Sequence, residues 1–197
     1  MEGVTPVGLI EDTNGTLYGM TDSGGPGNDS VVYSLSLGLG QFINPQPPAG
    51  EVGSPVSILG TDLTSATSVT FNGTPATFTV VSPTEIATQV PSGATTGKIE
   101  VVTPTATLFS NLTPFRVAPV ITGFTPTSGA PGTQIIISGS GFLKTSAVTF
   151  FLKAAAGFTI NSDTQITAMV PSNATAGAIQ VTTSGGTVTS TQRFTVE

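Results

Sequence analysis

The acidic side chains are the residues of this 197-residue chain that could do chemistry, because the sequence contains no His and no Cys. His is the commonest general base and transition-metal ligand, and Cys supplies thiolate nucleophiles and metal ligands. The eleven Asp and Glu residues would therefore have to act together. They could do so as a carboxylate pair across a glycosidase cleft or as oxygen ligands around a hard cation.

The acids are spread too thinly along the sequence for a catalytic pair. Five of them fall at expected turns or on expected exposed strand faces: Glu51, Asp62, Glu85, Glu100 and Asp163. Ser and Thr are abundant, but no His can activate them, and only three Lys are present for a Ser–Lys arrangement. We therefore predict a protein that is not an enzyme, with no catalytic residues and no cofactor.

The stretch from Glu11 to Gly15 is the best candidate for a metal site. Glu11-Asp12 followed by Asn14-Gly15 looks like the start of a calcium loop, but an EF-hand needs six ligand positions in its loop. A hairpin turn at Asn14-Gly15 explains the pattern better. Loop chemistry likewise explains the two Asp residues, at 22 and 29, that flank SGGPGN, so we predict no metal.

The charge and composition exclude several classes of protein. The net charge is -6, and the five basic residues are scattered, so neither nucleic acid nor anionic lipid is an expected partner. No apolar run reaches the length of a transmembrane helix, and the start has no signal-peptide pattern. An exported protein would thus be represented here by a mature form or an excised fragment. Only 8% of the residues are charged, which suits strands with polar but uncharged faces.

The sequence contains a long internal repeat, which indicates the elements that hold the acidic residues. PTSGAPGTQIIISGSGF at 126–142 aligns with PPAGEVGSPVSILGTDL at 47–63, so that Pro126 matches Pro47 and Phe142 matches Leu63. The match continues through PSGATTG at 91–97 and PSNATAG at 171–177, and it ends with PFRV and RFTV. This repeat is longer than the units of small solenoids, so each copy is expected to have its own core.

Each copy is expected to be a β-sandwich, because its apolar residues alternate over short runs bounded by Gly, Pro, Asn and Ser. Asn72-Gly73 is a hairpin signal. Pro47 and Pro126 are expected to hold an extended lead-in, and the nearby glycines have an architectural rather than a phosphate-binding role, since no helix follows. The expected strands are 54–59, 67–71, 75–80, 84–89, 97–103 and 106–117 in the first copy, and 133–138, 147–151, 157–160, 164–169, 177–183 and 187–196 in the second.

The repeated phrase carries a family resemblance. The motifs that carry this resemblance are, in order, F-x-P-x-x-G-x-x-G, an apolar run, G-x-x-F, V-x-F, V-P and a closing G-x-I-x-V strand. In these motifs the repeat resembles the IPT/TIG family of immunoglobulin-like domains. The first copy departs at Asp62-Leu63, where the family usually has Gly or Asn before an aromatic residue. The family occurs in bacterial surface proteins, plexin-type receptors, polysaccharide enzymes and Rel-type transcription factors. The scarcity of basic residues opposes a DNA-binding Rel-like function.

Residues 1–40 are different. GLIEDTNGTLYGMTDSGG resembles one unit of the G-L-I-x-D-x-x-G-x-L-Y-G-x-T-x-x-G-G tandem repeats found in large surface proteins of environmental bacteria. A strand over 30–39 alternates, with one apolar face that a single short unit cannot bury alone. It must pack on the first sandwich or on another chain. The residues of this candidate self-association strand are Val31, Tyr33, Leu35, Leu37 and Leu39.

We therefore expect an all-β chain with a β-repeat segment at 1–40 and two immunoglobulin-like sandwiches at 41–118 and 119–197, joined at Ala118-Pro119. The expected function is an extracellular or cell-surface structural module, a fibre or adhesin subunit or spacer that polymerises by strand sharing. Its expected partners are other copies or neighbouring surface proteins.

A carbohydrate- or protein-binding accessory module is the alternative, with a glycan as partner. It has little support in the aromatic residues, since Trp is absent, both Tyr lie within residues 1–40, and most Phe occupy core-type positions. The three Lys look exposed, so no buried Lys is available for an isopeptide bond. Five glycosylation sequons, at Asn14, Asn28, Asn72, Asn111 and Asn173, are expected by chance in so Thr-rich a chain.

Overall fold

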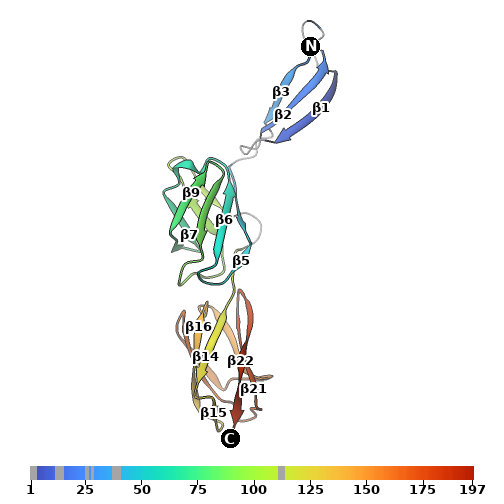
Figure 1. Ribbon diagram of the computed structural model, residues 1–197. Coiled ribbons are helices and arrows are strands. Elements are labelled where there is room, and N and C mark those ends of the chain that lie inside the picture. The colour runs from blue at the N-terminus through green and yellow to red at the C-terminus, as the bar shows by residue number, and fades with distance from the viewer. Residues whose placement is uncertain (1–3, 12–15, 25–26, 28, 37–40, 111–113) are drawn as a thin grey trace.

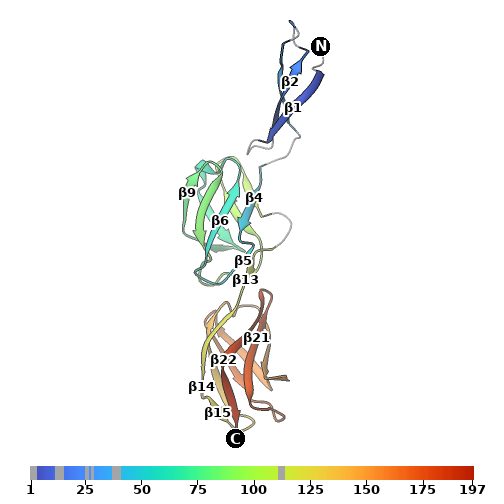
Figure 2. The same ribbon diagram turned by 45° about the vertical axis from the view of Figure 1, so that its right-hand side comes forward.

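The computed structural model describes residues 4–11, 16–24, 27, 29–36, 41–110 and 114–197. Apart from one 3-10 turn, η1 (Leu63–Ser65), the regular elements in these ranges are all β-strands, so the all-β prediction is confirmed. Figures 1 and 2 show a three-stranded sheet followed by two sandwiches that stand end to end. No helix in the described ranges is long and apolar enough to span a membrane.

The N-terminal sheet is an antiparallel meander in the order β1-β2-β3. It consists of β1 (Val4–Glu11), β2 (Thr16–Ser23) and β3 (Val32–Ser36). In both views it lies apart from the first sandwich (Figures 1 and 2). The expectation that it could fold back on residues 41–118 is therefore not met within the described residues.

The first sandwich packs the sheet β4-β6-β10-β9 on the sheet β12-β11-β7-β8, and a short parallel pair, β13-β5, closes one edge. Its strands are β4 (Ile43–Gln46), β5 (Ala49–Gly50), β6 (Pro55–Gly60), β7 (Ser68–Phe71), β8 (Thr74–Pro75), β9 (Phe78–Ser82), β10 (Glu85–Gln89), β11 (Ile99–Val102), β12 (Thr107–Phe109) and β13 (Arg116–Val117).

The second sandwich repeats this plan with the sheets β14-β16-β20-β19 and β15-β22-β21-β17-β18. Its strands are β14 (Val120–Thr125), β15 (Ser128–Gly129), β16 (Gln134–Ser140), β17 (Thr145–Phe150), β18 (Lys153–Ala154), β19 (Gly157–Ser162), β20 (Gln165–Met169), β21 (Gly177–Thr183) and β22 (Gly186–Val196).

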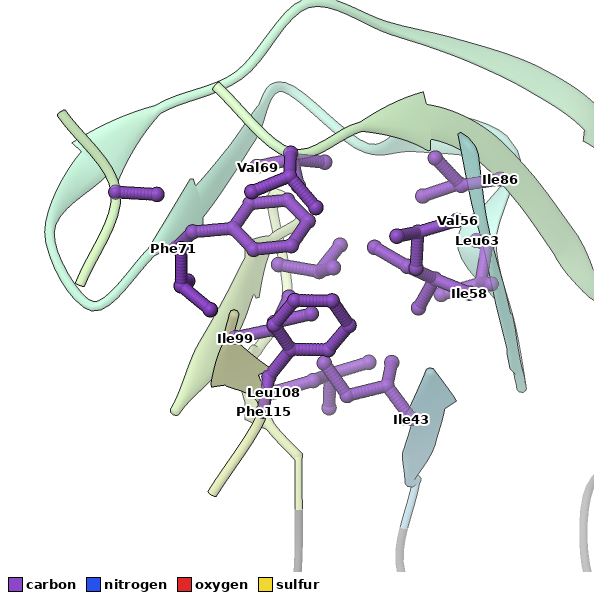
Figure 3. Packing of buried hydrophobic residues seen from close by; sticks show 14 residues of the cluster. Ile43, Val56, Ile58, Leu63, Val69, Phe71, Ile86, Ile99, Leu108 and Phe115 are labelled. Carbon is purple, nitrogen blue, oxygen red and sulfur yellow. The ribbon is translucent and has the colours of Figure 1, made fainter. Parts of the chain in front are cut away.

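Each sandwich has its own hydrophobic core, as the repeat length predicted. Figure 3 shows the first core, where the rings of Phe71, at the end of β7, and Phe115, just before β13, lie next to each other. They meet edge to face with centroids 5.1 Å apart. The equivalent pair in the second sandwich, Phe150 and Phe194, lies 5.3 Å apart. Edge-to-face pairs contribute about 0.5–1.5 kcal/mol beyond the area that they bury.

A buried serine hydrogen bond is repeated as well. The Ile99 N–H donates to the Ser110 hydroxyl over 3.0 Å, and the Ile179 N–H donates to Ser190 over 2.9 Å. Each serine hydroxyl accepts a hydrogen bond from a buried backbone N–H group. This stabilises the sandwich, because a buried N–H without a partner is costly. The duplication therefore extends to individual hydrogen bonds.

Sequence reasoning missed the first strand of each sandwich. β4 and β14 were expected only as an extended lead-in, and Pro47 and Pro126, which follow cis peptide bonds, come directly after these strands. The expected strand 106–117 was also too long, because β12 ends at Phe109 and β13 begins at Arg116. The Asn72-Gly73 hairpin is confirmed, with φ of 48° and 87°.

Candidate functional site

The acidic residues in the described ranges do not converge on one site. The Glu85 carboxylate accepts a hydrogen bond from the Ser57 hydroxyl over 2.6 Å, and Asp62 accepts one from the Gln41 amide over 2.8 Å. Glu51 lies in an exposed turn, and Glu100 lies on β11. In the described ranges, no three acidic side chains are close enough to hold a metal ion. Most of the Glu11–Gly15 candidate falls at 12–15, outside the described residues.

The predicted self-association strand is partly described. Tyr33 on β3 pairs with Gly19 on β2, and its ring covers that glycine so closely that a Cβ there would overlap the ring. Val31 is half-buried and exchanges hydrogen bonds with Thr21, whereas Leu35 is exposed. Leu37 and Leu39 lie outside the described residues. Among the described strands, β3 is at an edge of the sheet, where the outer backbone groups of a strand can pair with a further strand.

The opposite face of the N-terminal sheet is also apolar, which sequence reasoning missed. Met20 pairs with Val32 across β2 and β3; these side chains are 51% and 71% exposed, and Tyr18 beside them is exposed too. Alternation through Tyr18, Met20 and Asp22 could have revealed this face. With apolar residues on both faces, the sheet is typical of a layer that is covered by something else.

A close junction joins the two sandwiches. β13 ends at Val117 and β14 begins at Val120, so only Ala118 and Pro119 lie between strands. The loop at 91–97 touches the second sandwich, where the Gly93 N–H donates to the Asp163 carboxylate over 3.2 Å. The Val117 N–H is held within the first sandwich by the Thr96 hydroxyl, at 3.0 Å.

Gly185 makes this junction possible. A Cβ at position 185 would overlap the carbonyl oxygen of Val117 and would lie 3.1 Å from the Thr96 hydroxyl. The turn that contains Gly185 therefore fits directly against the end of the first sandwich. Gly141 is close as well, because a Cβ there would lie 3.0 Å from the Ala118 carbonyl. No sequence pattern signalled this contact.

A shallow hollow recurs at equivalent places on the two sandwiches. The larger one, about 400 Å³, is lined in the first sandwich by Pro55, Thr77, Phe78, Thr79, Ala87, Thr88 and Gln89. The second, about 250 Å³, is lined by Gln134, Gly157, Phe158, Thr159, Thr167, Ala168 and Met169. Both lie beside the edge strands β9 and β19. Their linings are neutral, with hydroxyl and amide groups that can form hydrogen bonds.

The family comparison fits the duplicated architecture. The family model described as IPT/TIG domain matches residues 43–117 and again residues 119–196. The chain belongs to the IPT/TIG domain family. The tandem arrangement of IPT/TIG sandwiches predicted from the sequence is thereby confirmed. No match was found among curated proteins.

Several solved structures match this chain at low sequence identity. The surface glycan-binding protein PbSGBP-B from Prevotella bryantii is 19% identical with a TM-score of 0.50, over 75% of this chain and 38% of that one. SGBP-B from a xyloglucan utilization locus in Bacteroides uniformis is 22% identical with a TM-score of 0.38, over 78% and 48%. The plexin A4 extracellular region is 17% identical with a TM-score of 0.38, over 80% and 18%. The IPT/TIG chain therefore spans less than half of the length of each.

Proposed function

We propose that this chain is a non-enzymatic structural module of the cell surface, a rigid spacer that joins other copies of itself through its N-terminal sheet. The observation that carries the proposal is the junction, where two residues separate the strands of consecutive sandwiches and Gly185 packs against Val117. A spacer must keep its ends apart, and a linker this short leaves little freedom for the sandwiches to fold over each other.

The N-terminal sheet supports the self-association part of the proposal. A three-stranded sheet with exposed apolar side chains on both faces gains little stability alone. Contact with another copy would remove these side chains from water, and the free edge of β3 offers backbone groups for pairing. Neighbouring surface proteins with a complementary apolar surface would serve the same role.

An extracellular or cell-surface location fits the same proposal. The Prevotella bryantii structure of similar fold is named as a surface glycan-binding protein. The uncharged, Thr-rich strand faces and the absence of Cys are compatible with a domain that works outside the cell.

The mass of the chain in solution tests this function. Light scattering over a concentration series should show the full chain growing beyond the mass of one copy, while residues 41–197 stay monomeric because their two cores are complete. A full chain that stays monomeric up to millimolar concentration would refute self-association, and assembly that survives removal of residues 1–40 would refute the role of the sheet.

Glycan binding is a second candidate, favoured by the repeated hollows. Their Thr and Gln side chains can bond to sugar hydroxyls, and they lie at equivalent places on both IPT/TIG sandwiches. Calorimetry with xyloglucan and mixed-linkage glucan oligosaccharides tests it. Binding that is lost in Ala87→Arg, which fills the larger hollow, would support this function, and heats equal to those of buffer dilution would refute it.

A further inference from the structure

The hairpin between β17 and β18 differs sharply from its counterpart in the first sandwich. There the two turn residues are Asn72 and Gly73, which readily adopt their positive φ values. The equivalent positions in the second sandwich hold Phe151 and Leu152, and Phe151 has a φ of 53°. A bulky residue is rare in this conformation, and such strain often accompanies a functional role.

The two side chains form an exposed apolar knob, which we call the hairpin tip. Phe151 is 46% exposed and Leu152 is 75% exposed. The tip is nevertheless held in place. The Phe151 N–H donates to the Ala178 carbonyl over 2.7 Å, and its side chain lies so close to Gly177 that a Cβ there would be 2.8 Å from the Phe151 Cβ.

Basic residues accompany the hairpin tip. Lys153 follows it directly, and Arg193 pairs with Ala178, the residue that accepts the Phe151 hydrogen bond. Residues 119–197 carry three basic and two acidic residues, whereas the chain as a whole has eleven acids and five bases. The exposed apolar tip therefore has Lys153 directly after it and Arg193 opposite Ala178.

The N-terminal sheet has the complementary character. Tyr18, Met20 and Val32 form an exposed apolar face, and Asp22 lies on the same face because it continues the alternation of β2. Residues 1–40 contain five acids and no Lys or Arg. Both surfaces are exposed within the described part of the chain, and they lie in units at opposite ends of it (Figures 1 and 2).

From this complementarity we infer that the hairpin tip of one copy docks on the Tyr18–Met20–Val32 face of the next copy, with Lys153 beside Asp22. Burial of Phe151 and Leu152 against this face removes apolar area from water on both partners, and the opposite charges select the partner. The contact joins two different surfaces, so it leaves one of each free and continues head to tail. This inference rests on the proposed self-association and specifies which surface of another copy binds the N-terminal sheet.

Pairing of two N-terminal sheets is the competing arrangement. It would bring two units with five acids and no base close together, and like charges at an interface oppose association. It would also close after two copies. Docking of the hairpin tip on the sheet of the next copy avoids both problems, because it joins opposite charges and leaves one surface of each kind free.

A turn exchange tests the inference without threatening the fold. Phe151→Asn with Leu152→Gly installs the Asn-Gly turn that the first sandwich already uses, so the second sandwich should fold as before. We expect its self-association, followed by light scattering of the full chain, to weaken about 100-fold or more, because two apolar side chains no longer become buried. Leu59→Ser, which removes an exposed apolar side chain from the first sandwich, is the control and should assemble like the parent.

Mixing experiments test whether the contact joins unlike surfaces. A second variant, Met20→Ser with Val32→Ser, removes the exposed face of the sheet. Each variant should be monomeric alone, and an equimolar mixture should form dimers that grow no further, because each variant retains one intact half. The single substitution Lys153→Glu should weaken assembly. Adding Asp22→Lys to the same chain should restore assembly partly, because the two charges are then opposite again.

The outcomes separate this inference from the proposed function. If the turn-exchange variant assembles like the parent while removal of residues 1–40 abolishes assembly, the sheet self-associates by another route and the inference is wrong. If the parent itself stays monomeric, the proposed function and the inference both fail. Sedimentation of the parent with zwitterionic phosphatidylcholine vesicles, lost in the turn-exchange variant and without any dimer, would assign the tip to a lipid surface and overturn the inference.

Discussion

A single methyl group at Gly185 should change the angle between the two IPT/TIG sandwiches. In Gly185→Ala the new Cβ overlaps the carbonyl oxygen of Val117, which belongs to the other sandwich, so the two bodies must separate locally. An ordinary contact distance is about 3.4 Å or more, and relief of the overlap requires a movement of roughly 2 Å. With a lever arm of about 10 Å, the spacing of packed sheets, this movement tilts one sandwich by on the order of 10°.

Residual dipolar couplings measure this tilt directly, because they report the orientation of each sandwich in one alignment frame. In the parent chain, couplings from residues 43–117 and 119–196 should fit a single alignment tensor when both sandwiches keep the arrangement described above. In Gly185→Ala the two sets should require orientations that differ by the tilt angle just derived. The control is Gly123→Ala, which adds the same methyl group where a Cβ has no neighbour within 4 Å, and which should leave the single fit intact.

The thermal stability of the variant completes this prediction. Each sandwich has its own core, so Gly185→Ala should lower the free energy of unfolding by less than about 1 kcal/mol. Asp163→Ala, which removes the acceptor for the Gly93 N–H, should loosen the junction in the same way but by a smaller angle. A single alignment tensor in Gly185→Ala would refute the reasoning, because the turn would then absorb the methyl group without moving the junction.

Three further variants test the second sandwich. Phe150→Ala should lower its free energy of unfolding by about 3–5 kcal/mol and leave the first sandwich unaffected in calorimetry; a shared loss would contradict two separate cores. Ser190→Ala should cost about 1–3 kcal/mol in urea unfolding, since the Ile179 N–H loses its partner, and an unchanged midpoint would show that this hydrogen bond is dispensable. Phe151→Asn with Leu152→Gly should raise stability by about 1 kcal/mol, or roughly 4–8 °C in Tm, and a lower Tm would show that the Phe151 packing outweighs its backbone strain.

The fold could be predicted from the sequence because its determinants are local and written twice. The spacing of the glycines, the alternation of apolar residues and the Asn72-Gly73 turn each specify a short piece of strand or turn. Most of these pieces recur at equivalent places in the second copy of the repeat. What the sequence did not predict was that β4 pairs with β6 and that β14 pairs with β16. Pro47 and Pro126 beside these strands indicated only an extended lead-in, because proline is uncommon within paired strands.

The candidate surfaces were harder to predict for a physical reason. The contact of Gly185 with Val117 depends on the relative placement of two folded bodies, which leaves no periodic signal in either segment. Alternation in β2 could have placed Tyr18 and Met20 on one face, but it could not show that Val32 lies opposite Met20, because that pairing depends on the register of β2 and β3. The hairpin tip did carry a signal, since Phe151-Leu152 stands in the repeat where Asn72-Gly73 forms the turn.

Electron microscopy of the full chain at high concentration tests the central claim most directly. If the chain is a rigid spacer that joins head to tail, the images should show unbranched filaments whose axial repeat equals the length of one chain, as measured by small-angle scattering of the monomeric turn-exchange variant. Single particles of one chain length at every concentration, or closed dimers, would contradict the account.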